Sequence, residues 1–266
     1  MATPTEPLAD IGVIGGSGLY SLLDDAEEHT VTTPYGDPAA PLTVGDFGGR
    51  RVAFLPRHGE GHRFPPHAIN YRANLWALHA AGVRQVLAPC AVGGLRDTVA
   101  PGDLVAPDQL VDRTFRRVGS YVETGAVHLP FADPYCPRLL AAIDEIDDVR
   151  TGATMVVVEG PRFSTRAESQ HYAAEGWDLV NMTGAPEAAL ARELRLCYAA
   201  IAVVTDMDAG VESGEGVGQA EVFALFARSL DRLRPVLESA VAAAPSPEGC
   251  TCRTWADDLD LTYLDR

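Results

Sequence analysis

The sequence predicts a single α/β domain with a mixed, twisted central β-sheet flanked by helices. Four runs of apolar, β-forming residues are typical of strands buried on both faces: 11–14, 86–91, 155–158 and 198–205. Segments that favour helix lie between or after them: 70–82, 138–146, 188–194 and 219–244. Buried strands that alternate with helices are typical of a sheet covered on both faces.

The composition narrows the class of protein. The 266 residues fit one large α/β domain, and a hydrophobic fraction of 47% is enough for a sizeable core. With 21 basic against 37 acidic residues, the formal net charge is −16 and the pI is about 4.7. Such a surface repels nucleic acid and anionic membranes, so neither is expected as a main partner. No apolar run has the length of a membrane span, and the first residues do not resemble a signal peptide, so a cytoplasmic protein is expected.

The order of segments predicts the organisation of the chain. The domain is expected to span residues 10–244, and the tail 245–266 is expected to pack on or near it. Residues 29–57 alternate short strand-like runs with turns, which predicts an antiparallel meander. Residues 113–132 are polar and irregular, which indicates a lid or an interface loop. The last helix is predicted to kink or break at Pro235, because proline has no N–H donor.

Small and polar residues follow the first predicted strands, at the edge where an open α/β sheet binds its ligand. The glycines around Ser17 can close on an anion, although a tight turn explains the same residues. A dinucleotide site is not favoured, because the third glycine is misplaced and no acidic residue closes a second strand. Arg57 and His58 end a strand and can hold phosphate oxygens, or can be a surface arginine with a capping histidine.

The most informative stretch runs from Thr154 to Glu193. A buried strand ends at a Gly-Pro pair and is followed by charged residues, hydroxyls and Phe163. A second short strand leads into Met182 and Thr183, just before a helix. A threonine there can present its hydroxyl, with free backbone N–H groups beside it, to an anion. The stretch therefore offers an aromatic wall, a Met–Thr floor and a seat for an anion.

Neither a metal site nor a catalytic thiol is expected. Three histidines are spaced in a way that suggests a metal site: His58, His62 and His67. Glycines between them disfavour the helix that this spacing needs, and no Cys or carboxylate completes a zinc set. A single residue separates Cys250 from Cys252, which is too close for the usual paired zinc set. Cys90 has no basic partner nearby in sequence that would activate it as a nucleophile. The odd number of cysteines, five, also does not match a secreted disulfide framework.

Long motifs in order along residues 10–240 resemble the family of trimeric purine nucleoside phosphorylases and methylthioadenosine phosphorylases. They are IGGSGLY (14–20), RHGEGHRFPPHAINYRANLWAL (57–78), PGDLV (101–105), EGPRFSTRAES (159–169), NMTGAPEAALARE (181–193) and VVTDMD (203–208). Several long motifs are more specific than any single glycine loop. The resemblance implies the family's fold and a homotrimer with its sites at the subunit interfaces.

The resemblance also implies phosphorolysis, in which inorganic phosphate attacks C1′ of a purine nucleoside and the base leaves. Phosphate is then a co-substrate, and no cofactor is expected. The positions that match the phosphate site are Ser17, Arg57, His58, the backbone N–H of Ala91, and Thr183. The positions that match the nucleoside site are Cys90, Phe163, Met182, Asp206, Asp208, Val217 and Val222, with His128 from a neighbouring subunit.

Asp206 and Asp208 are the expected catalytic residues. The purine must leave as a neutral base, so its N7 needs a proton, which a buried carboxyl group with a raised pKa can supply. Asp206 is assigned this role, and Asp208 is expected to accept a hydrogen bond from the 6-amino group. Both reach one pocket only if the chain bends at the end of the strand. Val217 and Val222 suit a methylthio group at the 5′ position.

These residues favour the conversion of 5′-methylthioadenosine to adenine and 5-methylthioribose 1-phosphate. Family members that act on 6-oxopurines generally carry Asn where Asp206 stands. Gly184, in contrast, resembles the variant that acts on methylthioinosine, so a purine nucleoside phosphorylase of broader or 6-oxopurine preference is the alternative. A non-catalytic nucleoside-binding protein and a dehydrogenase that uses the glycine loop are further alternatives.

Overall fold

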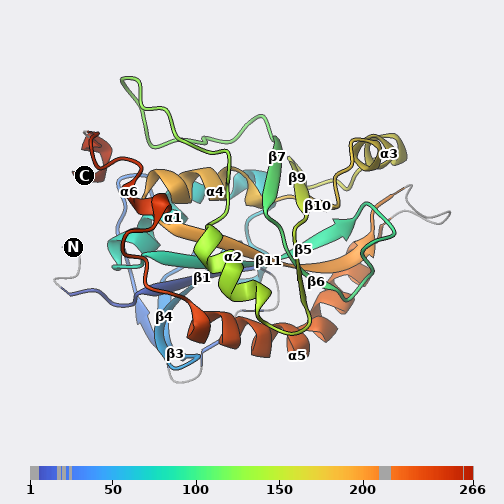
Figure 1. Cartoon of the computed structure of the whole chain (residues 1–266), viewed down its shortest axis with the longest axis horizontal. Helices are drawn as coiled ribbons and strands as arrows, with labels where there is room; N and C mark the ends of the chain where they lie inside the picture. The colour runs from blue at the N-terminus through green and yellow to red at the C-terminus, as the bar shows by residue number, and fades with distance from the viewer. Residues whose placement is uncertain are drawn as a thin grey trace.

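One mixed β-sheet organises the protein (Figure 1). The computed structural model describes residues 6–16, 19, 22–23, 26–209, 217–259 and 261–265. Within these residues, eleven strands form the sheet in the order β2-β3-β4-β1-β5-β10-β9-β7, and β11, β6 and β8 branch from β5. The strands are β1 Ile11–Gly15, β2 Glu27–His29, β3 Leu42–Phe47, β4 Arg50–Pro56, β5 Gln85–Gly94, β6 Leu104–Ala106, β7 Gln109–Arg113, β8 Val149–Thr151, β9 Thr154–Val158, β10 Leu179–Asn181 and β11 Cys197–Met207.

The two longest strands, β5 and β11, form the centre of the sheet. They run parallel from the pair Cys197 and Gln85 to the pair Met207 and Gly94. On its other side, β5 pairs first with β1 in parallel and then with β10 in antiparallel orientation. Strands β2, β3 and β4 form the predicted antiparallel meander. The prediction of a mixed α/β sheet is therefore confirmed.

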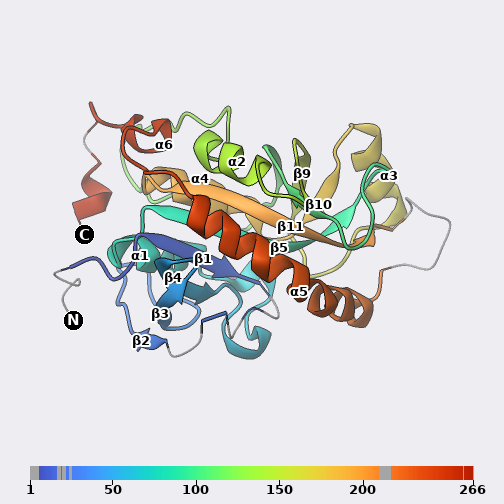
Figure 2. The ribbon, with the colours of Figure 1, turned by 60° about the horizontal axis from the view of Figure 1, so that its bottom comes forward.

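Helices cover both faces of the sheet (Figure 2). On one face α1 packs on α4, and on the other α2 packs on α5. The strands between them are buried on both sides, which explains their continuous apolar runs. The helices are α1 Tyr71–Ala80, α2 Pro137–Asp144, α3 Arg166–Ala174, α4 Gly184–Glu193, α5 Gln219–Ala243 and α6 Thr251–Thr254, with short 3₁₀ turns at Glu60–His62, Pro66–Ala68 and Thr262–Asp265.

Two local features differ from the sequence expectation. Helix α5 continues through Pro235 as one helix. Pro235 lies on the exposed side, so water can satisfy the carbonyl group that loses its N–H partner. The polar motif 159–169 contains the start of α3, whose N-cap Thr165 forms a capping box with Glu168. This helix was not predicted, because its apolar stripe is weak.

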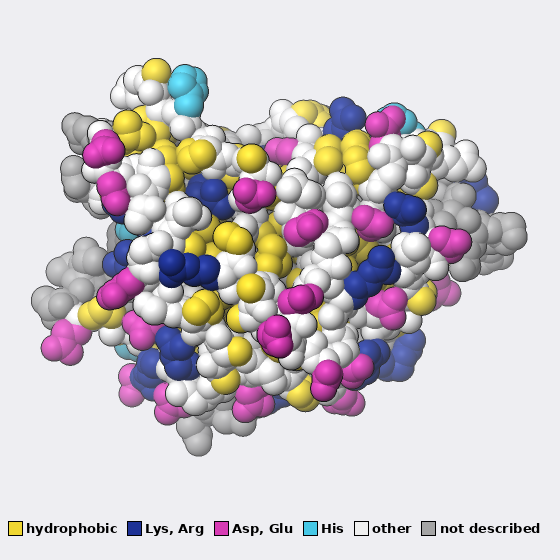
Figure 3. All heavy atoms as spheres, viewed as in Figure 1, with side chains coloured by type: hydrophobic (Ala, Val, Ile, Leu, Met, Phe, Trp, Pro, Cys, Tyr) yellow, Lys and Arg dark blue, Asp and Glu magenta, His cyan; other side chains and the backbone are white. Residues whose placement is uncertain are grey.

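The tail packs against the end of α4. The indole N–H of Trp255 donates to the carbonyl oxygen of Arg192 at 3.1 Å, and the hydroxyl of Tyr263 donates to that of Glu193 at 2.9 Å. In Figures 1 and 2, the segment that leads into β1 and the helix α6 both lie at the end of the sheet opposite α3. On the face in Figure 3, acidic side chains are scattered among the basic ones, and none of the described helices is long and apolar enough to cross a membrane.

Candidate functional site

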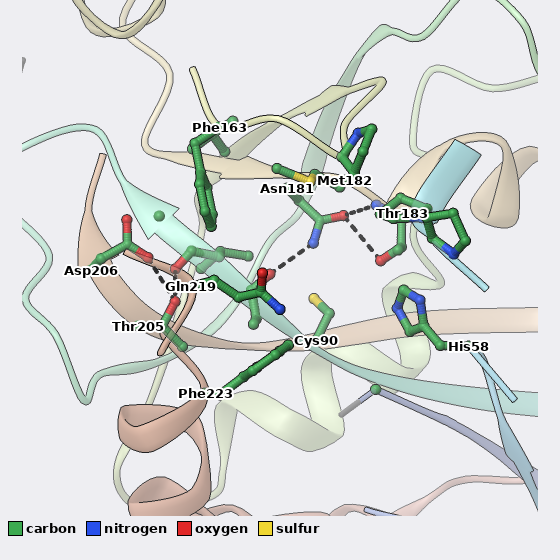
Figure 4. Close-up of a pocket in the computed structure, with 18 of the residues that line it drawn as sticks. His58, Cys90, Phe163, Asn181, Met182, Thr183, Thr205, Asp206, Gln219 and Phe223 are labelled. Carbon is green, nitrogen blue, oxygen red and sulfur yellow. Dashed lines mark hydrogen bonds between the residues drawn. The ribbon is translucent and has the colours of Figure 1, made fainter. Parts of the chain in front are cut away.

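A cavity of about 340 Å³ lies where the central strands end. The carboxyl ends of β4, β5, β10 and β11 contribute to it, together with the loop after β9 and the first turns of α5. This is the edge at which open α/β sheets bind ligands. Nine of the residues predicted from the sequence line the cavity: Arg57, His58, Cys90, Ala91, Phe163, Met182, Thr183, Asp206 and Asp208. Figure 4 shows Phe163 and Asp206 toward one end, and His58 and Thr183 toward the other.

A β-bulge near the end of β11 turns the two carboxylates into the cavity. The register of β11 against β5 shifts between Val204 and Asp206, so Thr205 is the extra residue. The bulge precedes both aspartates, and because residues two positions apart face the same side of a strand, the bend that the sequence analysis required between them is not needed. Gly93 of β5 lies opposite Asp206, and a Cβ atom there would be 3.1 Å from Asp206 Oδ1 and 3.2 Å from Asp208 Cβ. The absence of a side chain at Gly93 therefore leaves room for both carboxylates.

The two carboxylates have different surroundings. Burial raises the pKa of Asp206 to about 6, and the charge of Asp208 adds to this, although a hydrogen bond from the Thr205 hydroxyl at 2.8 Å opposes it. Asp208 is 3% exposed and accepts a hydrogen bond from the Ser169 hydroxyl at 2.5 Å. Asp206 is therefore suited to carry a proton, whereas Asp208 is suited to hold a fixed position.

Arg57 lies beside the cavity, but its guanidinium fork is occupied. Nε donates to Glu187 Oε2 at 2.7 Å and Nη2 donates to Oε1 at 2.9 Å. The carbonyl oxygens of Ile14 and Pro89 accept two further N–H groups at 2.9 and 3.0 Å. Burial alone would lower the pKa of Arg57, but the charge of Glu187 raises it above its ordinary value. The expectation that this fork holds phosphate is therefore wrong: a guanidinium has five N–H donors, and among the described residues four of them have partners, which leaves one on Nη1.

His58 is a neutral imidazole in this structure. Burial lowers the pKa of His58 to about 3. Its Nδ1 lies 2.9 Å from the carbonyl oxygen of Phe64, which can only accept a hydrogen bond, so Nδ1 carries the proton. Nε2 is then an acceptor rather than the donor that the sequence analysis expected. The ring stacks on that of His62, with centroids 4.0 Å apart, and His62 also lines the cavity.

The start of α4 is organised by Asn181. Its Oδ1 accepts the backbone N–H groups of Thr183 and Gly184, both at 2.7 Å, and its Nδ2 donates to the carbonyl oxygen of Ala91 at 3.0 Å. The free N–H groups predicted beside Thr183 are therefore not free. The Thr183 hydroxyl is 3.4 Å from the same Oδ1, a weak contact. A cavity-facing hydroxyl is thus what Thr183 offers to a ligand.

Gly184 does not line the cavity. A Cβ atom at this position would lie 2.7 Å from Met155 Cε and 3.3 Å from Val157 Cγ2 of β9. Glycine is therefore explained by close packing of α4 on the sheet. Gly184 therefore gives no indication of which purine base the cavity binds. Cys90 does line the cavity, and burial raises the pKa of its thiol to about 12, which does not suit a nucleophile.

Three of the described site residues that the sequence predicted do not line the cavity, and a fourth predicted residue is not described. Ser17 lies outside the described residues. Gln219 and Phe223 of α5 line the cavity, whereas Val222 of the same helix and Val217, which precedes it, do not. Gln219 and Phe223 are four residues apart and share one face of the helix, whereas Val222 is 9% exposed and packs inward. The sequence signal for Phe223 was a large apolar residue outside the buried stripe of α5. His128 is exposed on the loop between β7 and α2.

Comparison with known proteins agrees with this geometry. The family model of the phosphorylase superfamily matches residues 10–242. A purine nucleoside phosphorylase of Streptomyces coelicolor is 57% identical, with 95% of this chain and 96% of that protein covered. An S-methyl-5′-thioadenosine phosphorylase of Mycolicibacterium smegmatis is 55% identical over 91% of this chain and 93% of that protein.

Solved structures agree as well. A methylthioadenosine phosphorylase from an antarctic soil metagenomic library has a TM-score of 0.84 and 41% identity, and covers 94% of this chain and 91% of that one. A methylthioadenosine phosphorylase from Schistosoma mansoni in complex with adenine has a TM-score of 0.83 and 37% identity. The match covers 88% of this chain and 91% of that one. By sequence and fold, the chain belongs to the phosphorylase superfamily, within its purine nucleoside and methylthioadenosine phosphorylase family.

Proposed function

We propose that the chain is an S-methyl-5′-thioadenosine phosphorylase, a pentosyltransferase. Inorganic phosphate attacks C1′ of 5′-methylthioadenosine, adenine leaves, and 5-methylthioribose 1-phosphate forms. One observation carries this proposal: one cavity holds at one end a carboxyl group whose pKa is raised to about 6 by burial, and at the other end hydroxyl and imidazole groups. Two S-methyl-5′-thioadenosine phosphorylases that are 55% identical to this chain support it. The proposed reaction uses phosphate as a co-substrate and no cofactor.

At the base end, Asp206 is the proposed proton donor. The adenine stacks on Phe163 and directs N7 toward Asp206. With a pKa of about 6, Asp206 holds its proton to a higher pH than an ordinary aspartate and can give it to N7 as the glycosidic bond breaks. Asp208, oriented by Ser169, accepts from the 6-amino group. A 6-oxopurine presents a carbonyl oxygen there and would be repelled by a carboxylate.

At the other end, the proposed phosphate seat uses three side chains. The Thr183 hydroxyl and the last N–H of Arg57 donate to phosphate oxygens. Neutral His58 accepts a hydrogen bond from the P–OH group of monohydrogen phosphate through Nε2, since its Nδ1–H donates to the carbonyl oxygen of Phe64. The bound dianion then lies beside C1′ and stabilises the positive charge that develops on the sugar.

A homotrimer, with His128 supplied by a neighbouring copy, is part of the proposal. His128 is exposed and does not line the cavity of its own chain. Phe115 and Val118, on the loop that also carries His128, are 72% and 60% exposed, which favours an interface. Light scattering coupled to size exclusion tests the assembly. A monomeric, fully active protein would contradict it.

The test of the reaction is base release from 5′-methylthioadenosine, adenosine and inosine, each with and without phosphate. We expect adenine to be released from 5′-methylthioadenosine only with phosphate, and faster than base is released from adenosine or inosine. A higher rate with inosine would favour the alternative, a purine nucleoside phosphorylase, which the 57% identical relative makes the second candidate. Release without phosphate would identify a hydrolase and overturn the proposed phosphate seat.

A further inference from the structure

Four cysteines from distant parts of the chain meet at the end of the sheet opposite the cavity. Cys136 is the N-cap of α2 and Cys197 is the first residue of β11. Cys250 and Cys252 belong to the tail, at the N-cap and within α6. All four are at most 1% exposed, and their sulfur atoms lie within 4.8 Å of one another. The fifth cysteine, Cys90, is in the cavity and does not belong to this group.

The spacing of the sulfur atoms matches a tetrahedral metal site. Zinc binds thiolate sulfur at about 2.3 Å, so the sulfur atoms of a tetrahedral site are about 3.8 Å apart. Cys136 Sγ and Cys250 Sγ are 3.6 Å apart, and no pair in the group is beyond 4.8 Å. Two disulfides would instead divide the four sulfur atoms into two close pairs. All four sulfur atoms are instead close enough to one another to bind one ion.

The surroundings suit a closed structural site. The four cysteines lie in an apolar cluster with Leu139 and Ile143 of α2 and with residues of α5. Cys136 also stands at the N-terminus of α2, where the helix dipole favours a thiolate. Since four protein sulfurs fill the shell, no position is open for water or substrate. Asp206 is nine positions after Cys197 in β11, about 30 Å along an extended strand.

We propose that Cys136, Cys197, Cys250 and Cys252 form a tetrathiolate zinc site that fastens the tail to the domain. Binding of Zn²⁺ releases the four thiol protons to solvent. The site sits where Arg138 of α2 already holds the tail, since its guanidinium donates to the carbonyl oxygens of Glu248 at 2.8 Å and Gly249 at 3.0 Å. The metal therefore stabilises the fold and takes no part in the reaction.

The sequence analysis expected no metal site, because Cys250 and Cys252 are too close together for the usual paired set. The structure supplies the other two ligands from distant parts of the chain. Cys136 lies 114 positions before Cys250, and Cys197 lies 53 positions before it. Only the fold brings them together. The proposal corrects that expectation.

The test is the metal content and the cobalt spectrum of the full-length protein. Protein purified with reductant and zinc should contain about one zinc ion per chain by mass spectrometry of metals. Replacement of the zinc by Co²⁺ should give the thiolate-to-cobalt charge-transfer bands and the intense visible bands of a tetrahedral site. The readout needs no variant, so it stands even where a cysteine substitution prevents folding.

Variants locate the ion. Cys252→Ser and Cys197→Ser should lose the zinc and lower the melting temperature, whereas Cys90→Ser should keep one ion per chain. Zinc-free protein in which all five cysteines react as free thiols after denaturation would overturn the proposal. So would a mass lower by two or four hydrogen atoms, which would show disulfides in place of a metal. Zinc that persists in Cys252→Ser would place the ion elsewhere and overturn it as well.

Discussion

Arg57 and Glu187 form a bidentate ion pair inside the protein, with nitrogen–oxygen distances of 2.7 and 2.9 Å. Their side chains are 1% and 0% exposed. Arg57 follows β4 and Glu187 lies in the first turns of α4, so the pair joins the two elements on either side of the proposed phosphate seat. Tyr198 of β11 donates its hydroxyl to the same carboxylate at 2.7 Å. The pair positions Arg57 rather than leaving it free to wrap around a ligand.

Glu187→Gln should destabilise the protein strongly. The substitution leaves the charge of Arg57 buried without a counter-ion, which typically costs roughly 3–5 kcal/mol. Urea denaturation measures the free energy of unfolding. The matched control is Tyr198→Phe, which removes one hydrogen bond to the same carboxylate and should cost about 1 kcal/mol. Equal losses of unfolding free energy in the two variants would show that the ion pair stabilises the protein no more than one hydrogen bond does.

Asp206 should impose a pH dependence on catalysis. Because its pKa is raised to about 6, the carboxyl group is protonated below that pH and ionised above it. We expect kcat/KM for 5′-methylthioadenosine to fall as the pH rises through about 6, and we expect Asp206→Asn to lose this dependence. The titration of phosphate itself is common to both proteins and cancels in the ratio of their rates. A parallel pH profile in the two proteins would assign the proton to another group.

The same variant has an independent readout in stability. A carboxyl group whose pKa is raised on folding favours the native state below its unfolded pKa, and this contribution is lost as the pH rises through the folded pKa. The free energy of unfolding of Asp206→Asn, relative to the wild type, should therefore increase from pH 4 to pH 8. An unchanged difference would mean that Asp206 is not perturbed by burial.

Gly93→Ala should lower activity more than an ordinary surface substitution. A Cβ atom at this position meets Val180 Cγ1 at 3.0 Å, Asp206 Oδ1 at 3.1 Å and Asp208 Cβ at 3.2 Å. Relief of these contacts displaces the carboxylates, and overpacking of this kind typically costs about 1–3 kcal/mol. We expect kcat/KM to fall at least about tenfold. Gly119→Ala is the control, since its nearest contact would be 3.5 Å from Pro186 Cβ; a loss of the same size there would remove the steric explanation.

The layered architecture was predictable because buried strands leave continuous apolar runs. The strands at 11–14, 86–91 and 198–205 were placed from this signal, and each is slightly longer in the structure. What the sequence does not encode locally is which polar group each side chain meets. Arg57 was predicted to hold phosphate with its guanidinium. Nothing near it in sequence indicated that Glu187, 130 positions away, forms an ion pair with that group.

The prediction of which α5 residues line the cavity was wrong for a related reason. The helical period separates a buried from an exposed face, but it does not say that part of the exposed face closes a cavity. Val222 was chosen as the apolar contact, whereas Gln219 and Phe223 are the residues that line the site. The cysteine cluster was missed in the same way, because its four members come from three separate segments.

Phe223→Ala tests whether this wall recognises the 5′ substituent. Phe223 lines the cavity, remains 38% exposed, and its ring meets the edge of His62 with centroids 5.6 Å apart. Loss of apolar contact with one or two small groups typically weakens discrimination by about 1–3 kcal/mol. We therefore expect kcat/KM to fall about tenfold or more for 5′-methylthioadenosine, with a smaller change for adenosine, whose 5′ hydroxyl gains less from an apolar wall. Val222→Ala is the matched control, because Val222 packs inward and should affect both substrates equally. An equal loss for both substrates in Phe223→Ala would mean that the methylthio group is recognised elsewhere, and that the loop that carries His128 in a neighbouring copy is the place to look.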